Sequence, residues 1–238
     1  MPEAKERKVG LIVAGHGHQV EKHILPNDSF SALADPSDTK IFDISPARVS
    51  GVANAQVADC TRPLPADTPI DDGTIAFIST PDHLSVIDGL AKSGVKKIIV
   101  EKPMVNTRNQ LPRLRRITNE NDIRLFPIDF YYQKAYPLHA LTGAIKKDDP
   151  RLTTVKTDNG QPLDELHGKL NTMIGKIKKI DITIVEGGNF GIPDLAKRKW
   201  LQRDRDTGGM LLDLGTHALY PLFASGIVNP DNLKIVSA

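Results

Sequence analysis

Short apolar segments alternate with helix-like segments through the first half of the chain, and this alternation constrains the fold more than any other feature. Each apolar segment is nearly continuous, as expected for a strand that is buried on both faces. The expected strands are residues 8–15, 39–45, 74–81, 96–103 and 124–132, and the expected helices are residues 17–25, 83–94 and 107–121. Alternating strands and helices of this kind form a parallel sheet covered by helices. The pattern therefore predicts an α/β fold with a doubly wound, Rossmann-type domain over residues 1–125.

The pattern changes in residues 126–238, which we expect to form a second domain. Residues 134–147 read as a helix, and residues 148–169 are rich in turn formers without a sustained period, which predicts a loop or a lid. A strand is expected over residues 175–187, where isoleucines alternate with other residues, and a further strand is expected to begin at residue 232. Between these strands lies the segment GGMLLDLGTH at 208–217, which is expected to begin a buried helix.

Composition excludes several classes of protein. The 238 residues carry 31 Lys and Arg against 29 Asp and Glu, a net charge of +2, and the basic runs are short and scattered, so no nucleic-acid partner is expected. The single cysteine, Cys60, excludes an internal disulfide, fits a reducing compartment and provides no metal cluster. No segment is apolar for long enough to cross a membrane, and the N-terminus does not read as a signal peptide. A cytoplasmic protein without a metal site is expected.

A glycine loop follows the first strand. Gly15 and Gly17 occupy the first two positions of a dinucleotide-binding fingerprint, where glycine permits a tight turn and lets backbone amides approach a pyrophosphate. The third position, normally Gly or Ala, is Val20, which departs from the pattern. His16 and His18 are unusual neighbours in such a loop and are solvent-exposed by default. Gly15, Gly17 and His18 are the cofactor-binding candidates here.

The second strand ends in an acid, Asp43, which would accept hydrogen bonds from the adenosine ribose and so favours NAD. Arg48 follows closely enough to pair with a 2′-phosphate, so that NADP remains an alternative. Asp43 has an equally simple structural interpretation as the N-cap of a helix in the segment DISPAR.

The segment GGMLLDLGTH places an acid and an imidazole, Asp213 and His217, four residues apart in an otherwise aliphatic helix. That spacing puts both side chains on one face, about one turn apart. Burial of an acid costs several kcal/mol unless a partner satisfies it. The pair could simply make structural hydrogen bonds, or it could share a ligand or a proton.

The fourth strand ends in Glu101, Lys102 and Pro103. A lysine at the carboxyl end of a central strand faces the crevice in which doubly wound sheets bind ligands. Pro103 restricts Lys102 to an extended backbone. The chain carries six features in this order: the glycine loop, Asp43, TPDH at 80–83, EKPM at 101–104, Trp200 and GGMLLDLGTH. In these features the sequence resembles the Gfo/Idh/MocA family of sugar and polyol dehydrogenases.

The resemblance implies an N-terminal Rossmann domain and a C-terminal α/β domain with a large, open, mostly antiparallel sheet, through which the subunits of family members assemble. It therefore implies a homo-oligomer. By the motifs, Lys102, Asp213 and His217 would be catalytic, with His217 as the proton acceptor. The nicotinamide crevice would be lined by Thr80, Pro81 and His83, and Glu101 is a further cofactor-binding candidate.

The sequence also departs from the family. Lys134 stands where the family has an arginine, and the segment 148–169 has no counterpart. The chain stops about where the family's large sheet continues, so the second domain is expected to be either truncated or unusually small.

The expected function is hydride transfer between NAD or NADP and a secondary alcohol of a sugar, polyol or similar small molecule. Two alternatives remain: a regulatory homologue that binds the cofactor without chemistry, and an enzyme that uses bound NAD transiently for elimination or glycoside cleavage.

Overall fold

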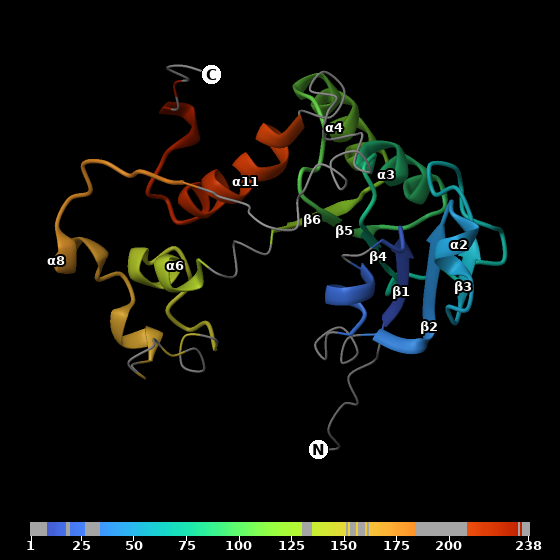
Figure 1. Ribbon diagram of the computed structural model, residues 1–238, viewed down its shortest axis with the longest axis horizontal. Helices are drawn as coiled ribbons and strands as arrows, with labels where there is room; N and C mark the ends of the chain where they lie inside the picture. The colour runs from blue at the N-terminus through green and yellow to red at the C-terminus, as the bar shows by residue number, and fades with distance from the viewer. Residues whose placement is uncertain are drawn as a thin grey trace. The chain divides into compact units, whose positions relative to one another are not determined.

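The computed structural model describes residues 9–17, 20–26, 34–129, 135–150, 162–183 and 209–232, and the single residues 152, 156, 160 and 234. At residue 23 and within 35–37 and 209–214 it describes the backbone alone. The chain divides into two compact units, with the division falling after Ile128, and the second unit begins at Asp129 (Figure 1). The roles of the two domains stay predictions.

Within the described residues, the first unit contains one six-stranded parallel sheet in the order β3-β2-β1-β4-β5-β6. This order is that of the doubly wound sheet, in which the chain reverses direction across the sheet between β1 and β4. The strands are β1 Val9–Ala14, β2 Ala34–Asp43, β3 Ala55–Val57, β4 Ile75–Ile78, β5 Lys97–Glu101 and β6 Arg124–Ile128. The predicted α/β fold with a parallel sheet is confirmed.

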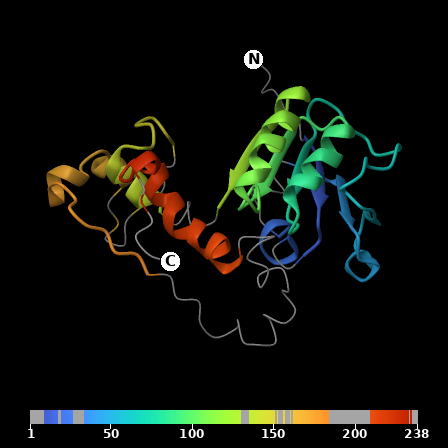
Figure 2. The ribbon, with the colours of Figure 1, turned by 90° about the horizontal axis from the view of Figure 1, so that it is seen from above.

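Two helices pack side by side on this sheet, α3 His83–Lys92 and α4 Leu111–Glu120 (Figures 1 and 2). Both carry apolar residues at helical spacing, and these residues join the buried faces of the central strands in one core. Leu90 and Ile98, from α3 and β5, are fully buried. A 3-10 turn, η2 Arg108–Gln110, leads into α4, and the short helix α2 Pro46–Val49 follows β2. Packing in this core holds the carboxyl ends of the central strands in position.

The structure corrects three sequence predictions in the first unit. The strand β3 was not predicted, because it has only three residues at the sheet edge and its side chains are half-buried or exposed. The strand β2 begins at Ala34, five residues before the predicted 39. In place of a helix over 17–25 there is a single π-helical turn, η1 Val20–Ile24.

The described part of the second unit is helical. Its elements are α6 Tyr136–Thr142, the 3-10 turn η3 Leu163–Leu166, α8 Leu170–Ile174, α11 Gly209–Ala224 and the 3-10 turn η5 Pro230–Asn232. A small apolar core joins α6 to η3, with Ala140, Leu152 and Leu163 fully buried. The predicted loop at 148–169 therefore contributes two core residues, Leu152 and Leu163, and a helical turn.

Other predictions for the second unit are wrong or fall outside the described residues. Residues 177–183 form no strand, and Ile182 is 44% exposed. Helix α11 is present where it was predicted, but its described side chains at 215–224 are partly buried or exposed rather than enclosed. Trp200 and Lys134 lie outside the described residues, as does most of the predicted terminal strand. No helix in the described part of the chain is long and apolar enough to cross a membrane.

Gly89 allows α3 to approach the loop after β3. A Cβ atom at this position would lie 2.7 Å from the Arg62 carbonyl oxygen and closer still to that of Cys60. Because both contacts are with backbone, Gly89→Ala should force α3 and this loop apart and lower the free energy of unfolding by about 1–3 kcal/mol. Chemical denaturation would measure this change. In the control Gly10→Ala the new methyl would make an ordinary 3.5 Å contact with Thr74 Oγ1 and should have a smaller effect. Equal effects would contradict the role of Gly89.

Candidate functional site

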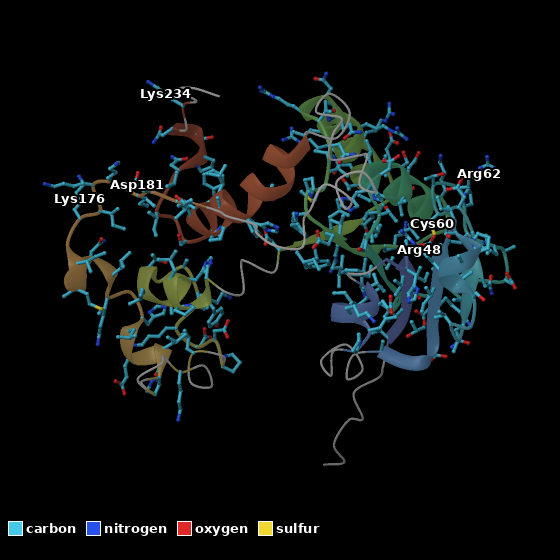
Figure 3. All side chains as sticks on the ribbon, in the orientation of Figure 1. Arg48, Cys60, Arg62, Lys176, Asp181 and Lys234 are labelled. Carbon is cyan, nitrogen blue, oxygen red and sulfur yellow. The ribbon has the colours of Figure 1, made fainter. Side chains whose placement is uncertain are left out.

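A cavity of about 240 Å³ lies at the carboxyl ends of β2 and β4 in the first unit. Its walls are formed by residues that directly follow β1, β2, β3 and β4, which is where parallel α/β sheets bind ligands. Arg48 and Cys60 both line it (Figure 3). The lining residues are Gly15, Phe42, Asp43, Ile44, Arg48, Ala58, Asp59, Cys60, Thr61, Ser79, Thr80, Pro81, Asp82 and Val86.

Gly15 closes the turn after β1 in a conformation that only glycine adopts readily. Its φ is +95°, and a Cβ atom would lie 2.5 Å from the Ser79 carbonyl oxygen and 2.7 Å from Thr80 Cγ2. The Gly15 N–H donates to the Phe42 carbonyl oxygen at 2.8 Å. The first glycine of the fingerprint thus brings the loop against both neighbouring strand ends.

The rest of the loop differs from the usual phosphate-binding arrangement. A Cβ atom on Gly17 would come no closer than 4.0 Å to Arg48 Nη1, so the space beside Gly17 is open. Val20, at the third fingerprint position, is fully buried and begins the π-helical turn η1 instead of a long helix. His18 lies outside the described residues.

Asp43 is a buried acid at the end of β2, with 3% of its side chain exposed. Its Oδ2 accepts the His16 backbone N–H and its Oδ1 accepts the Ser45 N–H, both at 2.8 Å, and Arg48 Nη1 lies 3.5 Å from Oδ2. The N-cap of α2 is Ser45, so the interpretation of Asp43 as the N-cap of that helix is wrong, and the bond from the Ser45 N–H instead orders the turn after β2. The His16 bond ties the acid to the glycine loop as well, and a carboxylate oxygen has lone pairs for further donors.

The segment after β4 supplies two predicted residues of the cavity, Thr80 and Pro81. His83, the first residue of α3, is 6% exposed and is not among the lining residues. Its Nδ1 lies 2.6 Å from the Pro103 carbonyl oxygen, so it is bound to the turn after β5. Burial lowers the pKa of His83, and the charge of Lys102 lowers it further, against the opposing effects of the Pro103 bond and Asp82.

Glu101 is the last residue of β5 and Lys102 follows it directly, both partly buried. Because β5 is parallel to β4, Lys102 emerges at the same edge of the sheet as Thr80. The structure therefore brings Gly15, Asp43, Thr80 and Lys102 to the carboxyl edge of one sheet.

His217 lies in α11 of the second unit and is bonded to an acid that the sequence analysis did not single out. Its Nδ1 is 2.9 Å from Oδ1 and 3.0 Å from Oδ2 of Asp129. The side chains are 10% and 2% exposed. Asp213 lies one turn earlier in the same helix, and its side chain is outside the described residues.

The Asp129 contact defines the tautomer of His217. A carboxylate can only accept, so Nδ1 carries the proton, and in the neutral ring Nε2 holds the lone pair. An imidazole held this way can take up a proton at Nε2 while the buried carboxylate stabilises the resulting cation, which is the arrangement of a general base with an orienting acid.

One feature of the sequence could have identified Asp129 as a candidate site residue. It follows the apolar segment RLFPI directly, and an acid just after a parallel strand lies at the edge where ligands bind. The prediction of one strand over residues 124–132 places Asp129 inside the strand, whereas β6 ends at Ile128.

No protein-family model matches the chain, and no curated protein sequence matches it significantly. Solved structures do resemble it. An NAD-binding protein from Listeria innocua matches 91% of this chain and 54% of its own length, at 15% identity and a TM-score of 0.53. This likeness shows that the chain has the α/β fold of a Rossmann-type protein.

Two further solved structures are similar at lower TM-scores. GenD2 from gentamicin A biosynthesis, in complex with NAD, matches 92% of this chain at 18% identity and a TM-score of 0.48. The WlbA dehydrogenase from Bordetella pertussis, in complex with NADH and UDP-GlcNAcA, matches 63% of this chain at 19% identity and a TM-score of 0.46. The chain spans 54% and 42% of their lengths, respectively.

Cys60 should be unreactive although it lines the cavity. It is 5% exposed, and burial, with the charges of Asp59 and Asp43, raises the pKa of its thiol to about 12. At pH 8 the folded protein then holds roughly a thousandfold less thiolate than the unfolded chain. Labelling with a chromogenic disulfide should be slow until denaturant is added. Equal rates in the two states would contradict this environment.

Proposed function

We propose that this chain binds a nicotinamide dinucleotide at the carboxyl edge of its sheet and catalyses hydride transfer to or from a secondary alcohol of a sugar, polyol or similar molecule. The observation that carries the proposal is the buried Asp43 beside the Gly15 turn at a cavity between strand ends. The Listeria innocua protein of the same fold is described as NAD-binding.

The residues of the cavity fit the adenosine half of such a cofactor. Asp43 would accept hydrogen bonds from the ribose hydroxyls, and the loop from Gly15 to Gly17 would let its backbone approach the pyrophosphate. Because the two Asp43 oxygens are fixed by backbone N–H groups, the acid cannot easily turn away from a 2′-phosphate. We therefore favour NAD over NADP, although Arg48 provides a positive charge 3.5 Å from the acid.

The nicotinamide ring, when bound, would exchange a hydride with the carbon that bears the hydroxyl. In oxidation, His217 Nε2 would accept the hydroxyl proton, and Asp129 would stabilise the imidazolium through Nδ1–H. Lys102 would donate a hydrogen bond to the alcohol oxygen as negative charge develops there. Asp213 would bind a neighbouring hydroxyl. In the reverse direction His217 returns the proton to the oxygen.

Replacing Asp43 tests the cofactor site. Asp43→Ala removes a charged acceptor, and loss of hydrogen bonds to a charged group costs about 1.5–3 kcal/mol, so the Kd for NADH should rise roughly tenfold or more. Titration by NADH fluorescence would measure the change, with NADPH in parallel. The control Asp59→Ala removes an acid of the same cavity that bonds to Thr61 and should change the Kd little. Unchanged NADH affinity in Asp43→Ala, or no binding to the unaltered chain, would refute the proposed site.

Replacing the proposed catalytic groups tests the chemistry. His217→Ala and Lys102→Ala should each lower kcat by about 10²-fold or more with NADH affinity retained, and Asp129→Asn should lower kcat by removing the carboxylate partner of the ring. Turnover of NAD against a panel of sugars and polyols would be measured. The control His167→Gln alters a histidine that bonds to the Ile145 carbonyl in the same unit, and it should leave kcat unchanged.

Three outcomes would redirect the assignment. Full activity in His217→Ala or Lys102→Ala would contradict the assigned roles. Cofactor binding without turnover of any substrate would favour a regulatory protein, and product formation without accumulated NADH would favour transient use of bound NAD.

A further inference from the structure

The turn after β5 is fastened to the start of α3 by two side-chain hydrogen bonds. His83 Nδ1 lies 2.6 Å from the Pro103 carbonyl oxygen. Three residues further along the turn, Asn106 Nδ2 donates to the Pro81 carbonyl oxygen at 3.1 Å. Lys102 immediately precedes the first of these contacts. The backbone that carries Lys102 is thus attached at two points to the neighbouring segment 81–83.

The contact at Pro103 determines the state of the His83 ring. A carbonyl oxygen can only accept, so Nδ1 must carry the proton. The ring is 6% exposed, and its burial together with the charge of Lys102 disfavours a second proton. His83 is therefore a neutral donor close to a cation, so it can hold the turn without repelling Lys102.

We propose that His83 is a positioning residue, which sets the place of the Lys102 ammonium by holding the Pro103 carbonyl oxygen. The proposal rests on the proposed function, because it gives His83 a role only through Lys102. The sequence prediction that His83 lines the nicotinamide crevice stays a prediction. The neighbouring hydrogen bonds from Asn106 and Thr107 to Gln110 Oε1, at 2.7 and 3.2 Å, fix the far end of the turn and leave His83 as the anchor next to Lys102.

Two substitutions separate the donor from the bulk of the ring. His83→Asn retains an N–H near the position of Nδ1, whereas His83→Leu fills a similar volume without a donor. We expect His83→Leu to lower kcat roughly tenfold to a hundredfold with NADH affinity unchanged, since a displacement of about 1 Å has effects of that size. We expect His83→Asn to retain most of the activity. Equal losses in the two variants would overturn the proposal.

A readout independent of turnover follows the Lys102 side chain itself. Reductive methylation with ¹³C-formaldehyde gives each lysine a resonance and preserves its charge, and the Lys102→Arg variant identifies the one that belongs to Lys102. The resonance should move in His83→Leu and stay close to its original position in His83→Asn. An unmoved resonance in His83→Leu would refute the positioning role, even in a chain without activity.

The electrostatic effect of Lys102 on His83 supplies a second measurement that does not depend on turnover. In Lys102→Met the pKa of His83, followed by imidazole NMR, should rise towards its ordinary value because a neighbouring cation is gone. An unchanged pKa would contradict the proximity on which the proposal depends. Should His83→Leu fail to fold, His83→Gln, whose amide lies near Nε2 instead of Nδ1, takes its place with the same expected losses. Full activity in Lys102→Ala, by contrast, would refute the proposed catalytic role of Lys102. The two spectroscopic measurements would still test whether His83 positions Lys102.

Discussion

The parallel pairing of β1 with β2 on one side and with β4 on the other is the constraint on which the first unit depends. Parallel strands all end at the same edge, so the turns that follow them are neighbours in space although far apart in sequence. Gly15 marks the point where this arrangement is tightest, because its missing side chain lets the β1 turn contact the end of β4. A larger residue there would separate the turn from Ser79 and open the cavity wall.

The central strands β1 and β4 could be predicted from sequence, since burial on both faces leaves an unbroken run of apolar residues. The edge strand β3 could not, because its three residues are held by backbone pairing with β2 and not by burial. For the segment 177–183 the error is the opposite one, because a strand was predicted there and the structure has none. Its isoleucines alternate as in a half-buried strand, but alternation only permits pairing, and no described segment pairs with it.

The candidate reactive residues could be predicted from sequence more readily than their partners. His217 stood out by its spacing from Asp213 on one helix face, since that relation is local. Its observed partner, Asp129, lies 88 positions earlier in the chain, and helical periodicity carries no information over such a separation. The same holds for His83 and Pro103, which are 20 positions apart and meet because the parallel strands β4 and β5 are neighbours and end at the same edge of the sheet.

The two proposed reactive groups are held by the same physical means. In each case a buried side chain fixes a group beside it: the Asp129 carboxylate fixes the ring of His217, and the His83 ring fixes the turn of Lys102. Burial strengthens these bonds, because breaking them would leave an unsatisfied polar atom at a cost of about 1–3 kcal/mol. Asp129 and His83 differ in charge because the groups that they hold differ. In the proposed mechanism the His217 ring becomes a cation, which a neighbouring carboxylate stabilises, whereas beside the charged Lys102 a neutral donor holds the turn without repulsion.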